Sequence, residues 1–353
     1  MRPYINAVSF ALAAAAALLV SFLFAAPRSQ DHVTVVVDES ARKVDISIDG
    51  QPFTSYIWST TLKKPVLYPL RTDKGTIVTR GFPLEQRSGE RVDHPHHAGL
   101  WFNYENVNGI DFWNNSDAIK PENAPKMGTI LHRKILSAKS GQHGELDVES
   151  DWITFDKKVL LNEHTHFVFS GAPESRTIDR ITTLRALDTE VDFPDAKDGL
   201  LGLRVLRALE MPSDKAEIFT DASGRPTTVA KLDNTGVNGT YLTSEGKKGD
   251  AAWGTRGHWC NLSGMVGAEP VTITILDHPS NPGFPTYWHA RGYGLFAVNP
   301  LGQKIFSEGK QQLNFSLAPH AYATFRYRIL ISSFLLTPDA TESAYKAFTE
   351  AYH

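Results

Sequence analysis

Three histidines fall within four residues in the segment 91–103, RVDHPHHAGLWFN. They are His94, His96 and His97, and Asp93 comes directly before them. Imidazoles this close together suit proton transfer on a small molecule, or binding of zinc, copper or iron. A polar loop in which one histidine hydrogen-bonds Asp93 is the third interpretation. We favour acid/base chemistry, with His96 and His97 as catalytic residues.

A metal site centred on the same three histidines is the main alternative. Such a site needs further ligands from elsewhere in the chain. Six side chains of suitable type are His132, Glu163, His164, His166, His278 and His289. The sequence contains no H-E-x-x-H spacing. We therefore favour no cofactor, and a divalent metal at His94, His96 and His97 stays the alternative.

The segment 107–115, VNGIDFWNN, places Asp111 among aromatic residues, where desolvation would raise the pKa of its carboxyl. Asp111 is therefore another catalytic candidate. Aromatic rings beside amides also suit sugars, because the ring packs on the apolar C–H face and the polar groups take the hydroxyls. We expect Trp101, Asn103 and Trp113 to bind substrate. A turn aspartate beside ordinary core aromatics is the equal alternative.

The segment 275–300, ILDHPSNPGFPTYWHARGYGLFAVNP, holds the third cluster. It begins as a buried strand whose end should place Asp277 and His278 beside a cleft. We predict that Asp277 and His289 are catalytic, and that His278, Trp288 and Arg291 bind substrate. An arginine binds a carboxylate or another anion through two parallel hydrogen bonds. A proline-rich connection with a structural arginine is the alternative.

Two other features are interpreted as structural. In LNEHTHFVFS, strand alternation puts Glu163 opposite His164 and His166, and a solvent face is favoured for the two histidines over a cleft. Cys260 is the only cysteine, so no intramolecular disulfide can form. A buried, small hydrophobic role for Cys260 is favoured over a nucleophilic one.

The elements that must position these residues are short strands. The segments 32–38 and 43–50 alternate apolar and polar residues, and Asp49-Gly50 is a hairpin signal. In 320–332 one face carries Phe325, Tyr327, Ile329 and Ile331. Further predicted strands are 53–59, 164–170, 176–187, 200–209, 271–277 and 293–300. Long loops over 80–130 and 211–260 carry most of the unusual residues. The prediction is an all-β fold, a large antiparallel sandwich over 31–336.

The two ends of the chain differ from this body. Residues 337–353 should form a short C-terminal helix, with Thr337 as the N-cap and Pro338 at the first position. Residues 1–26 combine Arg2 with an apolar run, as in an export signal. The run 7–26 is also about as long as a membrane span, roughly 20 residues. We expect an exported protein, periplasmic or secreted, with an uncleaved anchor as the alternative.

Composition excludes one class of partner. The chain has 353 residues and a formal charge of −3, and its longest basic runs are pairs such as Lys63-Lys64. Nothing in it is typical of a nucleic-acid-binding protein. We therefore expect a small-molecule or oligosaccharide partner, no nucleic acid, and contact with a membrane only through the N-terminal segment.

Several motifs, taken in order, resemble the PmoA-like family of bacterial proteins, often labelled "methane oxygenase PmoA". They are DHPHHAGLWF, VNGIDFW, AKDGLLGLRVLRA, WGTRGHWCNLSG, ILDHPSNPGFPTYWHARGYGLFAVNP and FRYRI. The resemblance runs from about Tyr56 to about Ser333. Members usually have a basic residue after the paired histidines, where this chain has Ala98, so no anion-binding role is expected there. Methane oxidation is excluded, because that enzyme's subunit spans the membrane several times and this chain has one apolar N-terminal segment.

The resemblance implies a galactose-mutarotase-like β-supersandwich, a fold common among proteins that act on or bind carbohydrates. We therefore predict an exported carbohydrate-related enzyme, a hydrolase, lyase or epimerase, that uses histidine and carboxylate acid/base chemistry in a cleft. Two other functions stay open: a metal-dependent enzyme at the histidine cluster, and a non-catalytic glycan-binding protein of the cell envelope. Fold-level analogy alone does not prove function.

Overall fold

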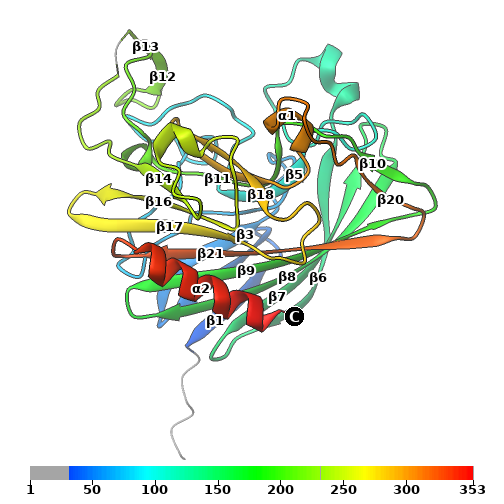
Figure 1. Cartoon of the computed structure of the whole chain (residues 1–353), viewed down its shortest axis with the longest axis horizontal. Helices are drawn as coiled ribbons and strands as arrows, with labels where there is room; N and C mark the ends of the chain where they lie inside the picture. The colour runs from blue at the N-terminus through cyan, green and yellow to red at the C-terminus, as the bar shows by residue number, and fades with distance from the viewer. Residues whose placement is uncertain (1–31, 231, 353) are drawn as a thin grey trace, which may run out of the picture. The chain divides into compact units, whose positions relative to one another are not determined.

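The computed structural model describes residues 32–230 and 232–352 (Figure 1). Two large antiparallel sheets make up most of this part of the chain, and a short helix follows them near the C-terminus. The predicted all-β class with a C-terminal helix is confirmed. The predicted signal or anchor, residues 1–26, lies outside the described residues. Among the described residues, no helix has the length and apolar character that crossing a membrane requires.

The first large sheet has nine strands, all paired antiparallel. The first three strands are consecutive in the sequence, and a two-residue strand joins them to the middle of the sheet. Strands from distant parts of the sequence meet there. In spatial order the strands are β1 (Val33–Asp38), β2 (Lys43–Ile48), β3 (Gln51–Ile57), β4 (Val66–Leu67), β5 (Leu100–Tyr104), β11 (Gly199–Arg204), β19 (Leu295–Asn299), β18 (Thr286–Arg291) and β15 (Arg256–Gly257).

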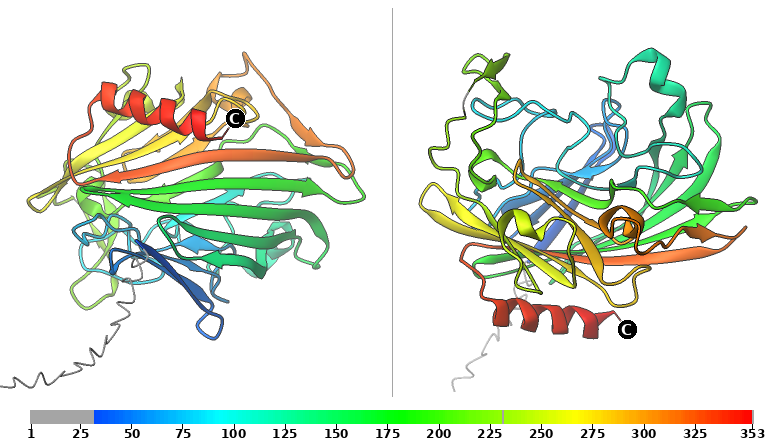
Figure 2. Two further views of the ribbon diagram at one scale, coloured as in Figure 1. Left: turned by 90° about the horizontal axis from the view of Figure 1, so that it is seen from below. Right: turned by 45° about the horizontal axis from the view of Figure 1, so that its top comes forward.

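The second large sheet has eight longer strands, also antiparallel. Figure 2 shows these strands lying side by side across the molecule's lower face. In spatial order they are β14 (Thr240–Thr243), β16 (Trp259–Val266), β17 (Glu269–Asp277), β21 (Tyr322–Ser332), β9 (Ser175–Ala186), β8 (Val159–Ala172), β7 (Gly144–Ile153) and β6 (Thr129–Lys139).

Smaller elements lie in the connections between the two sheets. Two strand pairs are β10 (Val191–Phe193) with β20 (Phe315–Leu317), and β12 (Glu217–Thr220) with β13 (Pro226–Val229). The short helical turns are η1 (Pro121–Lys126), η2 (Arg207–Leu209), η3 (Gly249–Ala252) and α1 (Gln303–Phe306), and the C-terminal helix is α2 (Pro338–Ala351).

The core lies between the two sheets, because apolar side chains of both sheets pack into one buried cluster. The Phe102 ring on β5 contacts the Phe325 ring on β21 at a centroid distance of 5.9 Å. On β21 the alternation predicted from the sequence holds, since Phe325, Tyr327, Ile329 and Ile331 all belong to this cluster. Asp49 and Gly50 both have positive φ, 51° and 73°, as a two-residue hairpin between β2 and β3 requires.

Two predicted segments differ from the structure. The strand predicted over 200–209 ends at Arg204, and Arg207–Leu209 is a 3₁₀ turn. The predicted loop over 80–130 contains β5, whose five residues are all buried. A strand buried on both faces lacks the alternation of polar and apolar residues that marks a half-exposed strand. Such a strand is therefore harder to recognise from its sequence.

The helix α2 covers the outer face of the eight-stranded sheet. Thr337 caps it as predicted, because its hydroxyl accepts a hydrogen bond from the Ala340 N–H at 3.2 Å. Phe348 packs fully buried against Trp259 and Leu276 of the sheet. Figure 2 shows the helix lying along β17 and β21, on the side away from the nine-stranded sheet.

Candidate functional site

The outer face of the nine-stranded sheet is the surface on which chemistry-bearing side chains gather. In β18, Trp288 and Ala290 face the core, and alternation therefore turns His289 and Arg291 outward. In β11 the same alternation turns Gly202 and Arg204 outward, beneath the loop that carries the three histidines. That loop lies between the β12–β13 hairpin and η1 in both Figure 1 and the right panel of Figure 2. We call Asp93, His94, Asp198, His289, Arg291 and Tyr293 the His94 site.

Asp93 is the fixed anion of the site. Its carboxylate accepts hydrogen bonds from Arg204 at 2.9 and 3.1 Å and from Arg80 at 3.0 Å. Both guanidinium groups are buried, and buried charges persist when they are paired and hydrogen-bonded. Arg80 also donates to the backbone carbonyls of Asp93, His94 and His97, at 2.8 to 3.1 Å. Two arginines from distant segments thus hold the histidine loop on the sheet.

His94 is the most exposed of the three histidines, with 42% of its side chain exposed. Its Nδ1 forms a short hydrogen bond with Asp93 Oδ2. A carboxylate on Nδ1 fixes the ring orientation and leaves Nε2 for a substrate, which is the role of the aspartate in Ser-His-Asp triads. The backbone of His94 has φ of 47°, a left-handed conformation that turns the loop at this residue.

His96 and His97 lie beneath this surface. Burial and the charge of Lys64 lower the pKa of His96 to about 2, and burial lowers the pKa of His97 well below its ordinary value. The Nδ1 atom of His97 lies 3.1 Å from a guanidinium nitrogen of Arg204. Its ring stacks on Trp101 at 5.1 Å. Both imidazoles are therefore neutral, and His97 serves to support the loop.

Asp198 and His289 form the second titratable pair. His289 Nδ1 lies 3.4 Å from Asp198 Oδ1, outside hydrogen-bond geometry. Burial raises the pKa of Asp198 to about 6, against the smaller opposing effect of Lys197. Burial lowers the pKa of His289 to about 3, so this imidazole is neutral. The pair therefore offers a carboxyl group that changes its charge near neutral pH.

Arg291 and Tyr293 lie between the two pairs. The Tyr293 ring is parallel to the His94 ring at 5.2 Å, and Arg204 lies over it at 4.8 Å. The Arg291 guanidinium contacts the rings of Tyr293 and Trp253 at 5.8 and 5.5 Å. Within the described residues, no carboxylate forms an ion pair with Arg291. An arginine stacked on aromatic rings and lacking an acidic partner is suited to receive an anion from a ligand.

Electrostatic effects connect these groups into one site. The positive charges of Lys197, Arg291 and His94 all contribute to the lowered pKa of His289. The pKa of Tyr293 is raised by burial, and both Asp198 and Asp93 add to that increase. Tyr293 stacks on His94, and His289 and Arg291 lie on the same outer face of the sheet.

The residues predicted around Asp111 lie under the same loops but are buried. Asp111 closes a turn, because one carboxylate oxygen accepts hydrogen bonds from the backbone N–H groups of Trp113 and Asn114, both at 2.9 Å. Asn103 donates to the Phe112 carbonyl at 2.6 Å. Trp101 and Trp113 pack edge to face at 5.2 Å, with almost no exposed surface. A β-carbon on Gly202 would lie 2.4 Å from Trp101, and glycine there leaves room for the indole.

Three other predicted residues lie apart from the His94 site. Asp277 is buried where β17 ends, and it accepts hydrogen bonds from the Asn281 side chain and the Thr286 backbone at 2.8 and 2.9 Å. Burial raises its pKa to about 7. The His278 ring packs edge-on against Phe348 at 5.3 Å. Trp288 faces the sandwich core. These positions connect strands or fill the core, and none of them offers a surface to a ligand.

The side chains considered as further metal ligands are scattered. Glu163 lies in the core, bound to Arg180 at 2.8 Å. His164 and His166 lie on the solvent face near Asp147, at 3.3 and 2.9 Å. Across the described part of the chain, no group of three or more histidine, cysteine or acidic residues is arranged to hold a metal ion. Cys260 is fully buried, and burial raises the pKa of its thiol, which makes it unreactive.

Sequence reasoning missed five residues of this region, Tyr293 among them. Asp198 and Arg204 stand in the motif AKDGLLGLRVLRA, and Trp253 stands in WGTRGHWCNLSG. Trp253 is the tryptophan that offers a surface at the site, with 39% exposed. Arg80 carries no local signal, because its partners lie 11 to 17 residues further along the chain.

The architecture is that of a two-sheet antiparallel β-sandwich with its candidate site on an outer sheet face. The chain belongs to a family of unknown function, DUF6807, whose model matches residues 43–346. No curated protein sequence matches the chain.

Solved structures to which this chain is similar include three with names from carbohydrate chemistry. The galactosidase domain of an alpha-galactosidase–sucrose kinase shares 10% identity at a TM-score of 0.40, over 85% of this chain and 42% of that chain. A putative aldose 1-epimerase from Escherichia coli K12 shares 10% identity at 0.37, over 86% and 99%. A galactose mutarotase-like protein from Clostridium acetobutylicum shares 9% identity at 0.35, over 87% and 100%. This chain thus spans less than half of the galactosidase chain.

Proposed function

We propose that this protein is an exported enzyme that transfers protons on a carbohydrate carrying a carboxylate, with His94 and Asp198 as the two proton-transfer groups. The observation that carries the proposal is that one sheet face holds both an exposed histidine, oriented by a fixed carboxylate, and a carboxyl group whose pKa is raised to about 6. Two groups whose environments differ in this way are suited to act as acid and base.

Arg291 defines the part of the substrate that this site would recognise. Its guanidinium has no carboxylate partner within the described residues and can donate two parallel hydrogen bonds to a substrate carboxylate. Trp253 beside it offers an exposed ring for the apolar face of a sugar. Lys197, Tyr293 and His94 add hydrogen-bonding groups for hydroxyls. A uronate combines these features.

The chemistry follows from these roles. One group removes the proton from the carbon next to the carboxylate, and Arg291 stabilises the negative charge that develops on the carboxylate oxygens. The other group returns a proton, either to the opposite face of that carbon in an epimerisation or to the departing oxygen in an elimination. Hydrolysis by two carboxylates is less well supported, because the Asp93 oxygens are occupied by two arginines and His94.

Two predictions made from the sequence bear on this proposal. The export signal or anchor in residues 1–26 would place the reaction outside the cytosol. The resemblance to the PmoA-like family stays a prediction, and methane oxidation is no part of the proposal. His96, His97 and Asp111 have supporting places here and Asp277 lies apart, whereas His289 lies beside the Asp198 carboxyl.

Deuterium exchange tests the proposal directly. The purified protein is incubated in D₂O with a panel of uronates and their neutral aldose counterparts, and NMR follows exchange at the carbon next to the carboxylate. We expect exchange in uronates only. His94→Gln and Asp198→Asn should each slow it by about a hundredfold or more, since a positioned acid or base contributes roughly 10²–10⁴-fold. Substrate affinity should change less than about tenfold.

The matched control is His143→Gln, at an exposed histidine of the β6–β7 turn, which should leave the exchange rate unchanged. Arg291→Lys should weaken uronate binding, because an ammonium cannot reproduce the two-pronged contact. Binding of uronates without any exchange would show a glycan-binding protein in place of an enzyme. Full exchange in both His94→Gln and Asp198→Asn would also overturn the proposal.

A further inference from the structure

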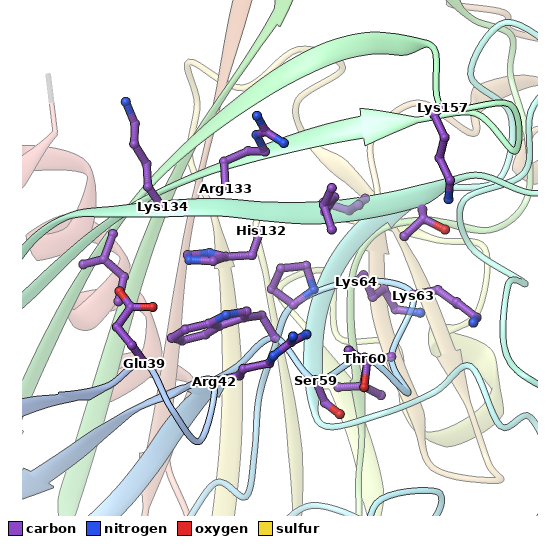
Figure 3. A pocket seen from close by; sticks show the side chains of 17 residues that line it. Glu39, Arg42, Ser59, Thr60, Lys63, Lys64, His132, Arg133, Lys134 and Lys157 are labelled. Atoms are coloured by element: carbon purple, nitrogen blue, oxygen red, sulfur yellow. The ribbon is translucent and has the colours of Figure 1, made fainter.

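A hollow whose lining includes no residue of the His94 site lies along the edge strand β6. It has a volume of about 650 Å³, within the roughly 300–1,000 Å³ typical of ligand sites. Its walls are the β1–β2 turn, the segment 58–65 that follows β3, and β6 itself (Figure 3). The backbone N–H of Ile130 donates to the Lys63 carbonyl at 2.8 Å, which fastens the segment to β6. The hollow is therefore a formed feature at the seam between the two sheets.

An aromatic pair forms one end of this hollow. The Trp58 and His132 rings lie 4.3 Å apart at an angle of 30°. The Tyr56 hydroxyl lies 3.1 Å from His132 Nδ1 and holds the imidazole in place. Burial lowers the pKa of His132 to about 4, so this ring is neutral at physiological pH. The half-exposed indole of Trp58 thus has a rigid, uncharged support.

Positive charge dominates the lining. A second hollow of about 310 Å³ shares Lys63, Thr129 and Lys157 with the first, and we call the two together the β6 trough. Its charged residues are six basic and two acidic, in a chain of net charge −3: Arg42, Lys63, Lys64, Arg133, Lys134 and Lys157 against Glu39 and Asp117. The excess of positive charge is therefore local to the trough.

Four of the six basic residues already have partners. Lys63 pairs with Asp117 at 2.5 Å, and buried Lys64 donates to the His96 carbonyl at 2.8 Å. Arg133 and Lys134 pair with acids of β7, and Figure 3 shows both directed away from His132. Arg42 and Lys157 have no ion-pair partner among the described residues. In Figure 3 both side chains extend toward the hollow, from opposite walls.

The far end of the trough carries a second aromatic residue. Phe155 lines the smaller hollow and is 56% exposed, in the turn between β7 and β8. An exposed phenylalanine in a formed hollow has apolar surface available for a ligand. The trough thus has Trp58 at one end, Phe155 at the other, and the unpaired cations Arg42 and Lys157 along it.

We propose that the β6 trough binds an oligosaccharide chain that carries carboxylate or sulfate groups. Aromatic rings pack on the apolar faces of sugar rings, and the hydroxyls of Ser59, Thr60 and Thr129 suit sugar hydroxyls. The unpaired Arg42 and Lys157 bind the anionic groups. Two adjoining hollows suit several sugar units in a row. The proposal stands independently of the reaction proposed for the His94 site.

Isothermal titration calorimetry on the full protein tests it. The probes are hexagalacturonate, a heparin-derived hexasaccharide, neutral maltohexaose and a twelve-residue oligothymidylate. We expect at least one of the two acidic sugars to bind, at least about tenfold more tightly than maltohexaose, with an affinity that falls as salt is raised. The hexasaccharide that binds more tightly distinguishes carboxylate from sulfate as the preferred group.

Variants of exposed or unpaired residues locate the site. The double variant Arg42→Ala/Lys157→Ala should weaken the acidic sugar by about tenfold or more, since charge-assisted hydrogen bonds are stronger than neutral ones. Phe155→Ala should weaken it several-fold. The matched control Lys139→Ala/Lys310→Ala removes two exposed cations elsewhere and should leave affinity unchanged.

Three outcomes would overturn the proposal. The first is no binding of either acidic hexasaccharide at millimolar concentration. The second is equal weakening by the control variant, which would show general attraction of charge. The third is oligothymidylate bound as tightly as the acidic sugars, which would show a polyanion surface. The Arg42→Ala/Lys157→Ala variant should keep wild-type deuterium exchange in monomeric uronates, so failure of the reaction and failure of the trough give different results.

Discussion

Asp198 shows how one buried position tunes a carboxyl group toward neutral pH. The residue lies at the start of β11, beside a neutral imidazole that cannot compensate its charge, and its cation Lys197 stays exposed at 3.4 Å. Burial raises its pKa to about 6, well above the value of about 3.9 in an unfolded chain. Burial therefore destabilises the ionised carboxylate, and this destabilisation is present at the pH where the proposed reaction would run.

The pH dependence of stability tests this assignment. Because the folded-state pKa is raised, the stability associated with the protonated carboxyl is present below about pH 4 and is lost as pH rises through 6. Asp198→Asn keeps a neutral group at every pH. Relative to the wild type, its free energy of unfolding should gain roughly 2–3 kcal/mol between pH 4 and pH 8, measured by urea denaturation.

The control for this measurement is Asp188→Asn, at an exposed aspartate, which should change the free energy of unfolding by less than about 0.5 kcal/mol. A constant difference for Asp198→Asn would mean that the carboxyl has an ordinary pKa. The proposed role of Asp198 in proton transfer would then lose its physical basis.

At the scale of residues, the sequence identifies the region of the His94 site better than it identifies the role of each residue there. The three clustered histidines, His289 and Arg291 could all be singled out by type and spacing. Which histidine is exposed could not, because Pro95 and the left-handed backbone of His94 break the strand alternation that would have ordered them. The orienting arginines were equally hidden, since their partners are set by tertiary contacts.

Among the elements, α2 is the one whose packing is easiest to isolate. It crosses the outer face of the eight-stranded sheet, and Phe348 is its fully buried contact. The Arg328 guanidinium lies over that ring at 5.0 Å, and His278 meets it edge-on at 5.3 Å. The Glu342 carboxylate also accepts hydrogen bonds from Trp259 and His258, both at 2.9 Å. The helix is thus attached by apolar packing centred on Phe348 and by hydrogen bonds to the sheet from Glu342 and Thr341.

Removing the apolar contact should loosen the helix. Phe348→Ala should lower the free energy of unfolding by about 3–4 kcal/mol, because a buried phenylalanine is replaced by a cavity. Chemical denaturation followed by tryptophan fluorescence measures it. Lys346→Ala, at an exposed position of the same helix, should change stability by less than about 0.5 kcal/mol. Equal effects of the two substitutions would show that α2 is not part of the cooperative fold.

Some strands were predictable from the sequence, and others were not. β2 and β21 alternate polar and apolar residues along most of their length, and the structure contains both. β11, β17 and β19 are buried on both faces, and their apolar runs still predicted them. β5 and β18 lie beneath the His94 site and are nearly all buried, and the sequence did not predict them. Two of the strands that position the site were therefore the hardest to predict.

The whole molecule depends on pairing that no local pattern specifies. β5, β11 and β19 lie side by side although about 95 residues separate each from the next along the chain, and this arrangement brings the histidine loop, Asp198 and Arg291 to one face. The antiparallel class followed from the short alternating strands. The order of strands within each sheet, and hence the composition of the site, required the three-dimensional structure.

A buried ion pair marks the centre of the sandwich. Glu163 on β8 and Arg180 on β9 meet at 2.8 Å, and both are almost fully buried. Arg180 lies between Phe167 of its own sheet and Phe102 of the nine-stranded sheet, at 5.1 and 4.9 Å. The Trp152 indole N–H donates to Glu163 at 2.7 Å. The charge pair thus belongs to the eight-stranded sheet, and its arginine packs on Phe102 of the other sheet.

A double-mutant cycle should show strong coupling at this pair. Glu163→Gln or Arg180→Met alone leaves a buried charge without its partner, and each should lower the free energy of unfolding by roughly 3–5 kcal/mol. The double variant removes both charges, and we expect it to lose less than the sum, by about 1–3 kcal/mol. Urea denaturation of the four proteins measures the coupling. The exposed pair Lys139–Glu145, 2.9 Å apart, is the control and should couple by less than about 1 kcal/mol. Additive losses at Glu163 and Arg180 would mean that each is held by its other hydrogen bonds, and that the charge pair itself does not stabilise the core.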